Sequence, residues 1–388
     1  MKCAIVVATY NRKELFKRTL NCVERADYTG YDDIDLIISI DRANNCEEMK
    51  AIADAFKWEH GKKTVILHEK RQGLRKHFIF CGGLSQKYGP VIFLEDDVVV
   101  NENYYRTAQL MTNQYIDDER IVGASLYTMS FNETAQRPFQ PIEDGSDVFF
   151  CSLMSWAPVY FPSQWKRFEQ WLLALNGREI VCQNVPQDVA NWPKSSFKKL
   201  HIQYVQQNEL YFAYTRHSCA TNFSEPGEHY KKDTNKLQVP MDIAPRESLI
   251  MKSLDDSCAV YDAFLEMKSE VLKRIIDNDI QEYDFDVDLY GKKPRQSIRK
   301  QYVLTTKKTT KAIRTFGRKM TPHEMNVIYN IQGSTIVLAR TEDVKFGSKG
   351  ISRYVNDVLY DIKGSTVLKI LIADCIWSID FIKSRLHK

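Results

Sequence analysis

The sequence lacks the two glycine-rich loops that most often mark phosphate binding. No Gly-x-Gly-x-x-Gly follows the first apolar run, and no Gly-x-x-x-x-Gly-Lys-Ser/Thr occurs anywhere in the 388 residues. These absences argue against a Rossmann dinucleotide site and against a P-loop. A nucleotide would therefore be held by individual side chains.

Paired cysteine motifs and a leader are lacking too. The nine cysteines include no Cys-x-x-Cys, so neither a zinc site nor a disulfide framework is indicated. Residues 1–8 are too short for a secretory signal peptide and instead predict a first strand. Scattered cysteines without a leader predict a reducing, cytoplasmic environment. The net charge of +4 is small.

What the sequence does contain is a regular alternation of apolar runs and helical patterns. The runs that predict strands are residues 3–8, 35–40, 64–68 and 91–94. The patterns that predict helices between them are residues 13–25, 47–56 and 73–88. This alternation predicts βαβ units and an α/β fold with a mainly parallel sheet flanked by helices. A chain of 388 residues is also long enough for two domains.

Polar side chains follow each predicted strand, at the edge where parallel sheets bind ligands. These segments are Thr9-Tyr10-Asn11-Arg12, Asp41-Arg42, Glu69-Lys70-Arg71 and Glu95-Asp96-Asp97. Asp41 could accept a hydrogen bond from a ribose hydroxyl or a base N–H, and Arg12 or Arg71 could meet a phosphate. Each of these residues could equally be a solvated loop charge.

The stretch from Val91 to Val100 is the most informative. Four apolar residues run into Glu95, Asp96 and Asp97. Three acids at the end of a buried strand are costly unless a cation meets them. Two interpretations are open: a divalent metal site that holds a phosphate-bearing substrate, or an acidic turn that ends the strand. The polar residues after the other strands favour the metal site.

The middle of the chain offers further candidates. Residues 130–145 contain two prolines and little periodicity, which predicts a mobile loop that folds over a substrate. Asp188 lies just before Trp192, and His229 lies in a polar loop where it is either a ligand or a surface residue. An aromatic stripe in a predicted helix is either core or a sugar platform: Trp165, Phe168, Trp171 and Leu172.

Taken together, these blocks resemble nucleotide-sugar-dependent glycosyltransferases of the GT-A fold, both the family-2-like bacterial enzymes and N-acetylglucosaminyltransferase I. The blocks are residues 6–12, Asp41, residues 73–78, Glu95-Asp96-Asp97, and Asp188 near Trp192. The resemblance covers about residues 3–230. It departs from the family at the base motif, which has Gln187-Asp188 in place of the paired Trp-Asp-Asp-Trp form.

The resemblance implies a GT-A-like catalytic domain at residues 1–240 and a metal-dependent, inverting transfer of a sugar. Mn²⁺ or Mg²⁺ would be bound by Asp97, with His229 closing its shell or touching the phosphates. Asp188 would be the catalytic base. The residues implied to contact the donor, with a UDP-sugar favoured, are Thr9, Tyr10, Arg12, Asp41, Arg71, Arg75, His77, Glu95 and Asp96.

The implied acceptor is a hydroxyl of a glycan or of a lipid-linked acceptor in surface polysaccharide synthesis. One alternative is a non-catalytic protein that binds sugar nucleotides on the same fold. A nucleotidyltransferase is a third possibility, although Thr9-Tyr10-Asn11-Arg12 is not the glycine-rich first loop typical of that class. A glycosidase needs two carboxylates but no triple-acid motif, so hydrolysis is less favoured than sugar transfer.

Residues 241–388 are expected to form a mainly helical, basic region, with one amphipathic helix at residues 254–277. Residues 292–319 carry eleven Lys or Arg and no Asp or Glu. Three interpretations of this run are open: a solvated face, a contact with an anionic membrane, or a contact with an acidic acceptor. Nucleic acid is not expected as a partner, because no nucleic-acid motif accompanies the run.

The final segment, residues 351–388, predicts a helix with one apolar face. Charged residues such as Lys369, Asp374 and Asp380 interrupt it, so a membrane-spanning helix is not expected. The apolar face would pack in the core, form a homodimer, or lie in a membrane interface. The last interpretation would place the protein at the inner face of the membrane.

Overall fold

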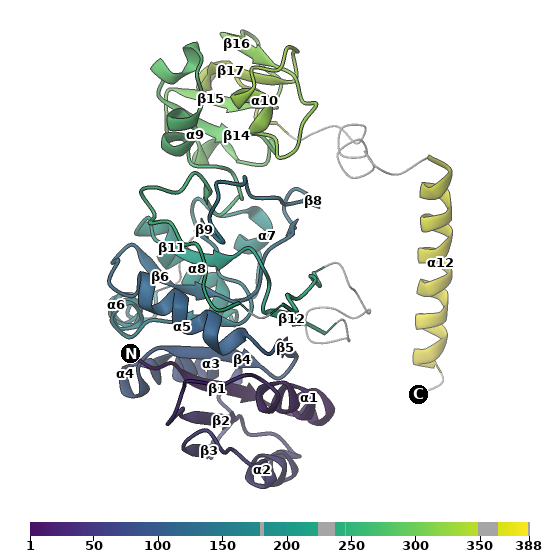
Figure 1. Ribbon diagram of the computed structural model, residues 1–388. Coiled ribbons are helices and arrows are strands. Elements are labelled where there is room, and N and C mark those ends of the chain that lie inside the picture. Colours follow the sequence, from purple (N-terminus) through teal and green to yellow (C-terminus); the bar gives the residue numbers. More distant parts are fainter. Residues whose placement is uncertain (179–181, 224–236, 245, 348–363, 387–388) are drawn as a thin grey trace.

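The computed structural model describes residues 1–178, 182–223, 237–244, 246–347 and 364–386 (Figure 1). Its centre is a nine-stranded sheet with the order β13-β9-β11-β6-β10-β4-β1-β2-β3. The strands are β1 (Ala4–Thr9), β2 (Leu36–Ile40), β3 (Lys63–Leu67), β4 (Val91–Glu95), β6 (Ile121–Ser125), β9 (Val148–Cys151), β10 (Pro158–Tyr160), β11 (Tyr211–Thr215) and β13 (Val260–Tyr261). The predicted α/β class with a mainly parallel sheet is confirmed, because only β9, β10 and β13 oppose the other strands.

Helices flank this sheet, as the periodicity predicts. They are α1 (Lys13–Glu24), α2 (Cys46–Ala55), α3 (Gly73–Gly83), α4 (Ser85–Tyr88), α5 (Tyr104–Tyr115), α6 (Pro162–Ala174), α7 (Gln187–Ala190) and α8 (Phe197–Gln207). In α6, Trp165 and Phe168 are buried against Phe197 of α8. The aromatic stripe is therefore core rather than a sugar platform.

The order of the first four strands determines where a ligand can bind. β1 pairs with β2 on one side and with β4 on the other, all three in parallel. From β1 the chain thus continues to β2 and β3 on one side, and α3 then leads it back to β4 on the other side of β1. Such a reversal opens a crevice beyond the carboxyl ends of the two central strands, here β1 and β4.

The segment 130–145 contains more order than its composition indicates. It includes an antiparallel hairpin of β7 (Phe131–Asn132) and β8 (Arg137–Pro138), with Gln136 at a positive φ of 55° in the turn. Strands of two residues are too short to show an alternating pattern, which explains why the sequence does not reveal them.

The expectation of a mainly helical region at 241–388 is wrong. This region contains a four-stranded sheet of β14 (Phe285–Asp288), β15 (Tyr302–Thr305), β17 (Ile336–Arg340) and β16 (Arg314–Phe316). The shorter elements are α9 (Ser269–Ile275), α10 (Met325–Ile328), and the 3₁₀ turns η1 (Asp279–Glu282), η2 (Arg295–Ser297) and η3 (Thr341–Asp343).

The predicted helix at 254–277 is likewise wrong, and tertiary pairing is the reason. Val260 and Tyr261 form β13, which extends the large sheet by pairing with β9, so only the last part of the segment is helical. One continuous apolar cluster joins residues of the two sheets, such as Phe150 and Leu304. The division of the chain into two domains at residue 240 stays a prediction.

The basic run 292–319 is not one free face. Lys300 pairs with Asp284 at 2.9 Å and Lys307 with Asp288 at 2.7 Å. These contacts follow from the parallel pairing of β14 with β15, which brings the acidic stretch beside the basic one. Part of the run's charge is thus paired within the protein.

The last helix, α12 (Gly364–Leu386), stands apart from the two sheets in Figure 1. Its apolar side chains are exposed, including Leu368 at 62% and Leu371 at 58%. It therefore does not form part of the core of this chain. Over the described parts of the chain, no helix has the length and apolar character needed to cross a membrane.

Candidate active site

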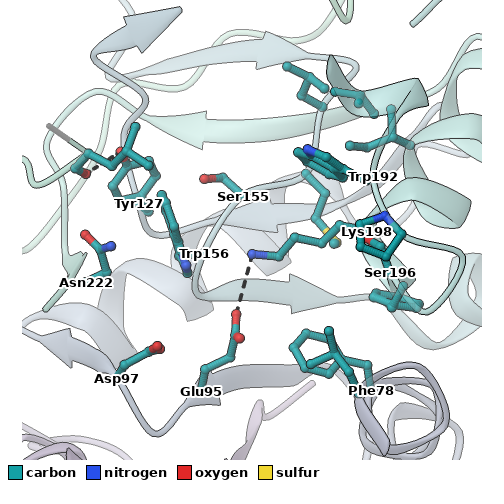
Figure 2. A pocket seen from close by; sticks show the side chains of 18 of the residues that line it. Phe78, Glu95, Asp97, Tyr127, Ser155, Trp156, Trp192, Ser196, Lys198 and Asn222 are labelled. Carbon is teal, nitrogen blue, oxygen red and sulfur yellow. Dashed lines mark hydrogen bonds and ion pairs between the residues drawn. The ribbon is translucent and has the colours of Figure 1, made fainter. Parts of the chain in front are cut away.

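A cavity of about 760 Å³ lies beyond the carboxyl ends of β1 and β4 (Figure 2). It brings together ten of the twelve predicted site residues: Thr9, Tyr10, Arg12, Asp41, Arg71, His77, Glu95, Asp96, Asp97 and Asp188. Arg75 does not line it. His229 falls outside the residues that the structure describes.

Asp96 is the most deeply held of the three acids. The Thr9 hydroxyl donates to its Oδ2 at 2.8 Å, and the Arg12 guanidinium pairs with its Oδ1. Burial raises the pKa of Asp96, as does the neighbouring Asp97, whereas Arg12 and Thr9 act in the opposite direction. Both carboxylate oxygens are therefore already engaged by the protein. The expectation that Asp96 contacts the donor stays a prediction.

Asp97 is engaged on one side only. Its Oδ2 accepts from Arg12 at 2.8 Å, whereas its Oδ1 is buried and has no hydrogen-bond partner. The side-chain oxygen of Asn222, another residue lining the cavity, is also buried without a partner. Unpaired buried oxygens are costly and suit a hard divalent cation such as Mn²⁺ or Mg²⁺. No cluster of three or more His, Cys, Asp or Glu ligands occurs among the described residues.

Glu95 pairs with a different cation from Asp96 and Asp97. Its carboxylate pairs with the Lys198 ammonium of α8 at 3.5 Å, and that ammonium lies 5.0 Å from the ring centre of Trp156 (Figure 2). Burial raises the pKa of Glu95, and Lys198 opposes this shift. The Glu95 carboxylate is thus 22% exposed and forms an ion pair with Lys198.

Asp41 shapes the site through the backbone. Its two carboxylate oxygens accept from the N–H groups of Gln72 at 2.7 Å and Gly73 at 2.9 Å, at the start of α3. A carboxylate at a helix N-terminus satisfies N–H groups that have no partner within the helix. Nearby, the Arg71 guanidinium lies over the Tyr10 ring at 5.0 Å.

His77 is a neutral imidazole at neutral pH. Burial lowers its pKa to about 4, although the nearby Asp41 acts against this shift. Its Nε2 lies 2.8 Å from the Ser39 hydroxyl, which is also 3.2 Å from the Nε2 of His68. His77 can therefore hydrogen-bond a ligand through its other nitrogen but supplies no positive charge.

Asp188 is an exposed residue of the short helix α7 and lines the same cavity as the three acids. The Thr134 hydroxyl, from the β7–β8 hairpin, is 3.0 Å from its Oδ1 and 3.2 Å from its Oδ2. One oxygen of the carboxylate can accept from Thr134 while the other stays available to a ligand. The segment expected to cover a substrate thus contacts the candidate base.

Sequence reasoning does not find Lys198, Thr134 or Asn222. Lys198 is one of several lysines in a polar helix, and no spacing distinguishes it from Lys199. Thr134 and Asn222 lie in segments without periodicity. These residues reach the cavity only through contacts between segments far apart in the sequence.

No family model matches this sequence, and neither does any curated protein. Among solved structures, the chain is similar to S. aureus TarS 1-349 in complex with UDP-GlcNAc, with a TM-score of 0.38 and 16% identity over 59% of this chain and 60% of that one. It is also similar to GalNAc-T7 with UDP, GalNAc and Mn²⁺, with a TM-score of 0.38 and 13% identity over 57% of this chain and 43% of that one.

A third similar structure is the mannosyltransferase PcManGT from Pyrobaculum calidifontis in complex with GDP-Man and Mn²⁺. The TM-score is 0.31 and the identity 12%, over 44% of this chain and 46% of that one. The chain therefore spans less than two thirds of the length of each of these proteins. At TM-scores below 0.4 these similarities assign no function to this chain. They give no support to the resemblance to N-acetylglucosaminyltransferase I.

Proposed function

We propose that this protein is a metal-dependent glycosyltransferase of GT-A-like fold that moves a sugar from a nucleotide-sugar donor, with a UDP-sugar favoured, to an acceptor hydroxyl. The observation that carries the proposal is the convergence of two separate sets of groups in one cavity. Asp97 and its partners stand at the carboxyl ends of the central strands, and Asp188 reaches the same cavity from α7. A metal-assisted leaving-group site and a base are the two parts that such a transfer needs.

The donor end would be organised by the residues at the strand ends. Asp97 would hold Mn²⁺ or Mg²⁺ through its unpaired Oδ1, with His229 as a further proposed ligand. When bound, the ion supplies positive charge that stabilises the departing nucleoside diphosphate. Arg71 would meet the nucleotide, and Glu95 would accept hydrogen bonds from hydroxyls of the donor sugar.

The acceptor end would depend on Asp188. A carboxylate oxygen of Asp188 would take the proton of the acceptor hydroxyl as that oxygen bonds to the anomeric carbon. The bond from the anomeric carbon to the phosphate oxygen would break on the opposite face, and the electron pair would leave with the diphosphate. A single displacement of this kind inverts the anomeric configuration. Thr134 would orient the base.

Thermal unfolding in the presence of nucleotide sugars tests the proposal directly. UDP-, GDP- and dTDP-sugars would each be added with and without MnCl₂. A donor at 100 times its Kd stabilises a protein by about 2.7 kcal/mol, which raises the Tm of a unit of about 250 residues by roughly 5 °C. A flat response to every donor would contradict the proposal.

The main alternative is a non-catalytic protein that binds the same donors. Such a protein has no need of a base in the cavity, so the position of Asp188 favours an enzyme. Release of the nucleoside diphosphate with time separates the two functions. Binding without any release, across glycan and lipid-linked acceptors, would favour the binding protein.

A further inference from the structure

The ion pair between Glu95 and Lys198 links two parts of the chain that are about a hundred residues apart. Lys198 extends from the first turn of α8 across the cavity, and its ammonium points at the Glu95 carboxylate (Figure 2). The side chain of Lys198 is 25% exposed and that of Glu95 is 22% exposed, so the pair is largely shielded from solvent. Pairs in such surroundings are stronger and better fixed than pairs on an open surface.

Two cations pair with the three acids. Arg12 pairs with Asp96 and Asp97, whereas the one ion pair of Glu95 within the described residues is with Lys198. Thr9 adds a further hydrogen bond to Asp96. Glu95 therefore has a counter-ion of its own, whereas Asp96 and Asp97 share Arg12.

Lys198 is itself held in place. Its ammonium lies 5.0 Å from the ring centre of Trp156, and Trp156 packs edge-on against Tyr127 with ring centres 4.9 Å apart. A cation over an aromatic face is attracted to it, which limits the positions that the flexible lysine stem can take. The aromatic pair and the lysine thus form a fixed wall facing Glu95.

We propose that Lys198 is a positioning residue that fixes the Glu95 carboxylate as an acceptor for hydroxyls of the donor sugar, and so determines affinity for the sugar rather than for the nucleotide. This inference rests on the proposed function. Hydrogen bonds to a charged acceptor are strong only when the acceptor is already oriented. Lys198 would act through Glu95 and would not contact the nucleotide.

The test compares Lys198→Met with the unaltered full chain by calorimetric titration of UDP-GlcNAc and of UDP alone, both with MnCl₂. We expect the Kd of UDP-GlcNAc to rise about tenfold, the loss expected for one charged hydrogen bond, and the Kd of UDP to change less than about twofold. Lys198→Arg should restore most of the affinity. Lys166→Met, at an exposed lysine of α6 outside the cavity, is the matched control and should change neither Kd.

A double-mutant cycle with Glu95→Gln isolates the coupling. If Lys198 acts through Glu95, the double variant binds UDP-GlcNAc no more weakly than Glu95→Gln alone. Additive losses, or an equal loss for UDP, would overturn the inference by showing that Lys198 contacts the donor directly. If Lys198→Met does not fold, Lys198→Gln keeps a hydrogen-bond donor without the charge and supports the same comparison.

The two proposals fail in different ways. If Lys198→Met binds UDP-GlcNAc as tightly as the unaltered protein does, the positioning role is overturned and the proposed function still stands. Unaltered protein that binds none of the UDP-, GDP- or dTDP-sugars overturns both.

Discussion

Replacement of Arg12 by methionine tests how the acidic motif is held in the fold. The substitution keeps most of the apolar stem and removes the guanidinium that pairs with Asp96 and Asp97. Loss of one partner of a buried ion pair costs about 3–5 kcal/mol, because the other charge stays buried and unpaired. Asp96 is almost fully buried, but Arg12 is 33% exposed and Thr9 still donates to Asp96, so we expect the lower end, about 3 kcal/mol.

This free energy corresponds to a measurable fall in Tm. For a cooperative unit of about 250 residues, 1 kcal/mol lowers Tm by about 2 °C, so Arg12→Met should lower it by about 6 °C. Differential scanning calorimetry at pH 7 in EDTA measures this without a bound metal. The matched control is Arg42→Met, since the exposed pair of Arg42 with Glu47 is worth at most about 1 kcal/mol.

Two results decide the question. In a double variant, Asp96→Asn should recover part of the stability lost in Arg12→Met, because the unpaired buried charge is then gone. If Arg12→Met lowers Tm no more than Arg42→Met does, Arg12 is not the counter-ion that stabilises the motif, and the reasoning is refuted.

Four further predictions follow from the site and from the C-terminal half. Asp97→Ala should abolish transfer and the Mn²⁺-dependent rise in Tm while the protein stays folded; full activity in this variant, or in EDTA, contradicts the metal role. Asp188→Asn should lower kcat by at least about 10²-fold with the donor Kd unchanged, and near-normal turnover would place the base elsewhere. Burial raises the pKa of Glu324 to about 7, so its contribution to stability is complete below about pH 4.5 and is lost as the pH rises through 7. Glu324→Gln should therefore be about 3 kcal/mol more stable than the unaltered protein at pH 8 and no more stable at pH 4.5 in urea unfolding. Tyr261→Phe, which removes the hydrogen bond to Glu324, is the control, and equal stability of Glu324→Gln and the unaltered protein at pH 8 contradicts the prediction. If α12 lies in a membrane interface, a chain ending at Gly350 should lose binding to phosphatidylserine vesicles in a flotation assay, and unchanged binding contradicts that role.

The strand-end residues were predictable because their position follows from local pattern alone. Alternating strands and helices with right-handed crossovers bring the carboxyl ends of parallel strands to one edge of the sheet. Thr9, Asp41 and Glu95 each follow an apolar run directly, so they meet at the cavity without any knowledge of tertiary contacts. The buried face of α1 was predictable for the same reason, since its spacing is visible in the sequence.

The C-terminal half shows what local pattern cannot decide. Residues 254–277 have helical spacing, yet Val260 and Tyr261 pair with β9 and form the edge strand of the large sheet. Pairing with a strand more than a hundred residues away outweighed a modest helical preference. The basic run 292–319 likewise looked unpaired until β14 and β15 brought acidic residues beside it.

The sequence by itself determined which polar residues stand at the ends of β1, β2 and β4, because that placement depends only on the order and period of apolar residues. Tertiary structure alone decided what each acid meets. Arg12 holds Asp96 and Asp97, and Lys198 reaches Glu95 from α8. Such contacts depend on how α8 packs over the cavity, and packing between distant segments leaves no periodic trace in the sequence.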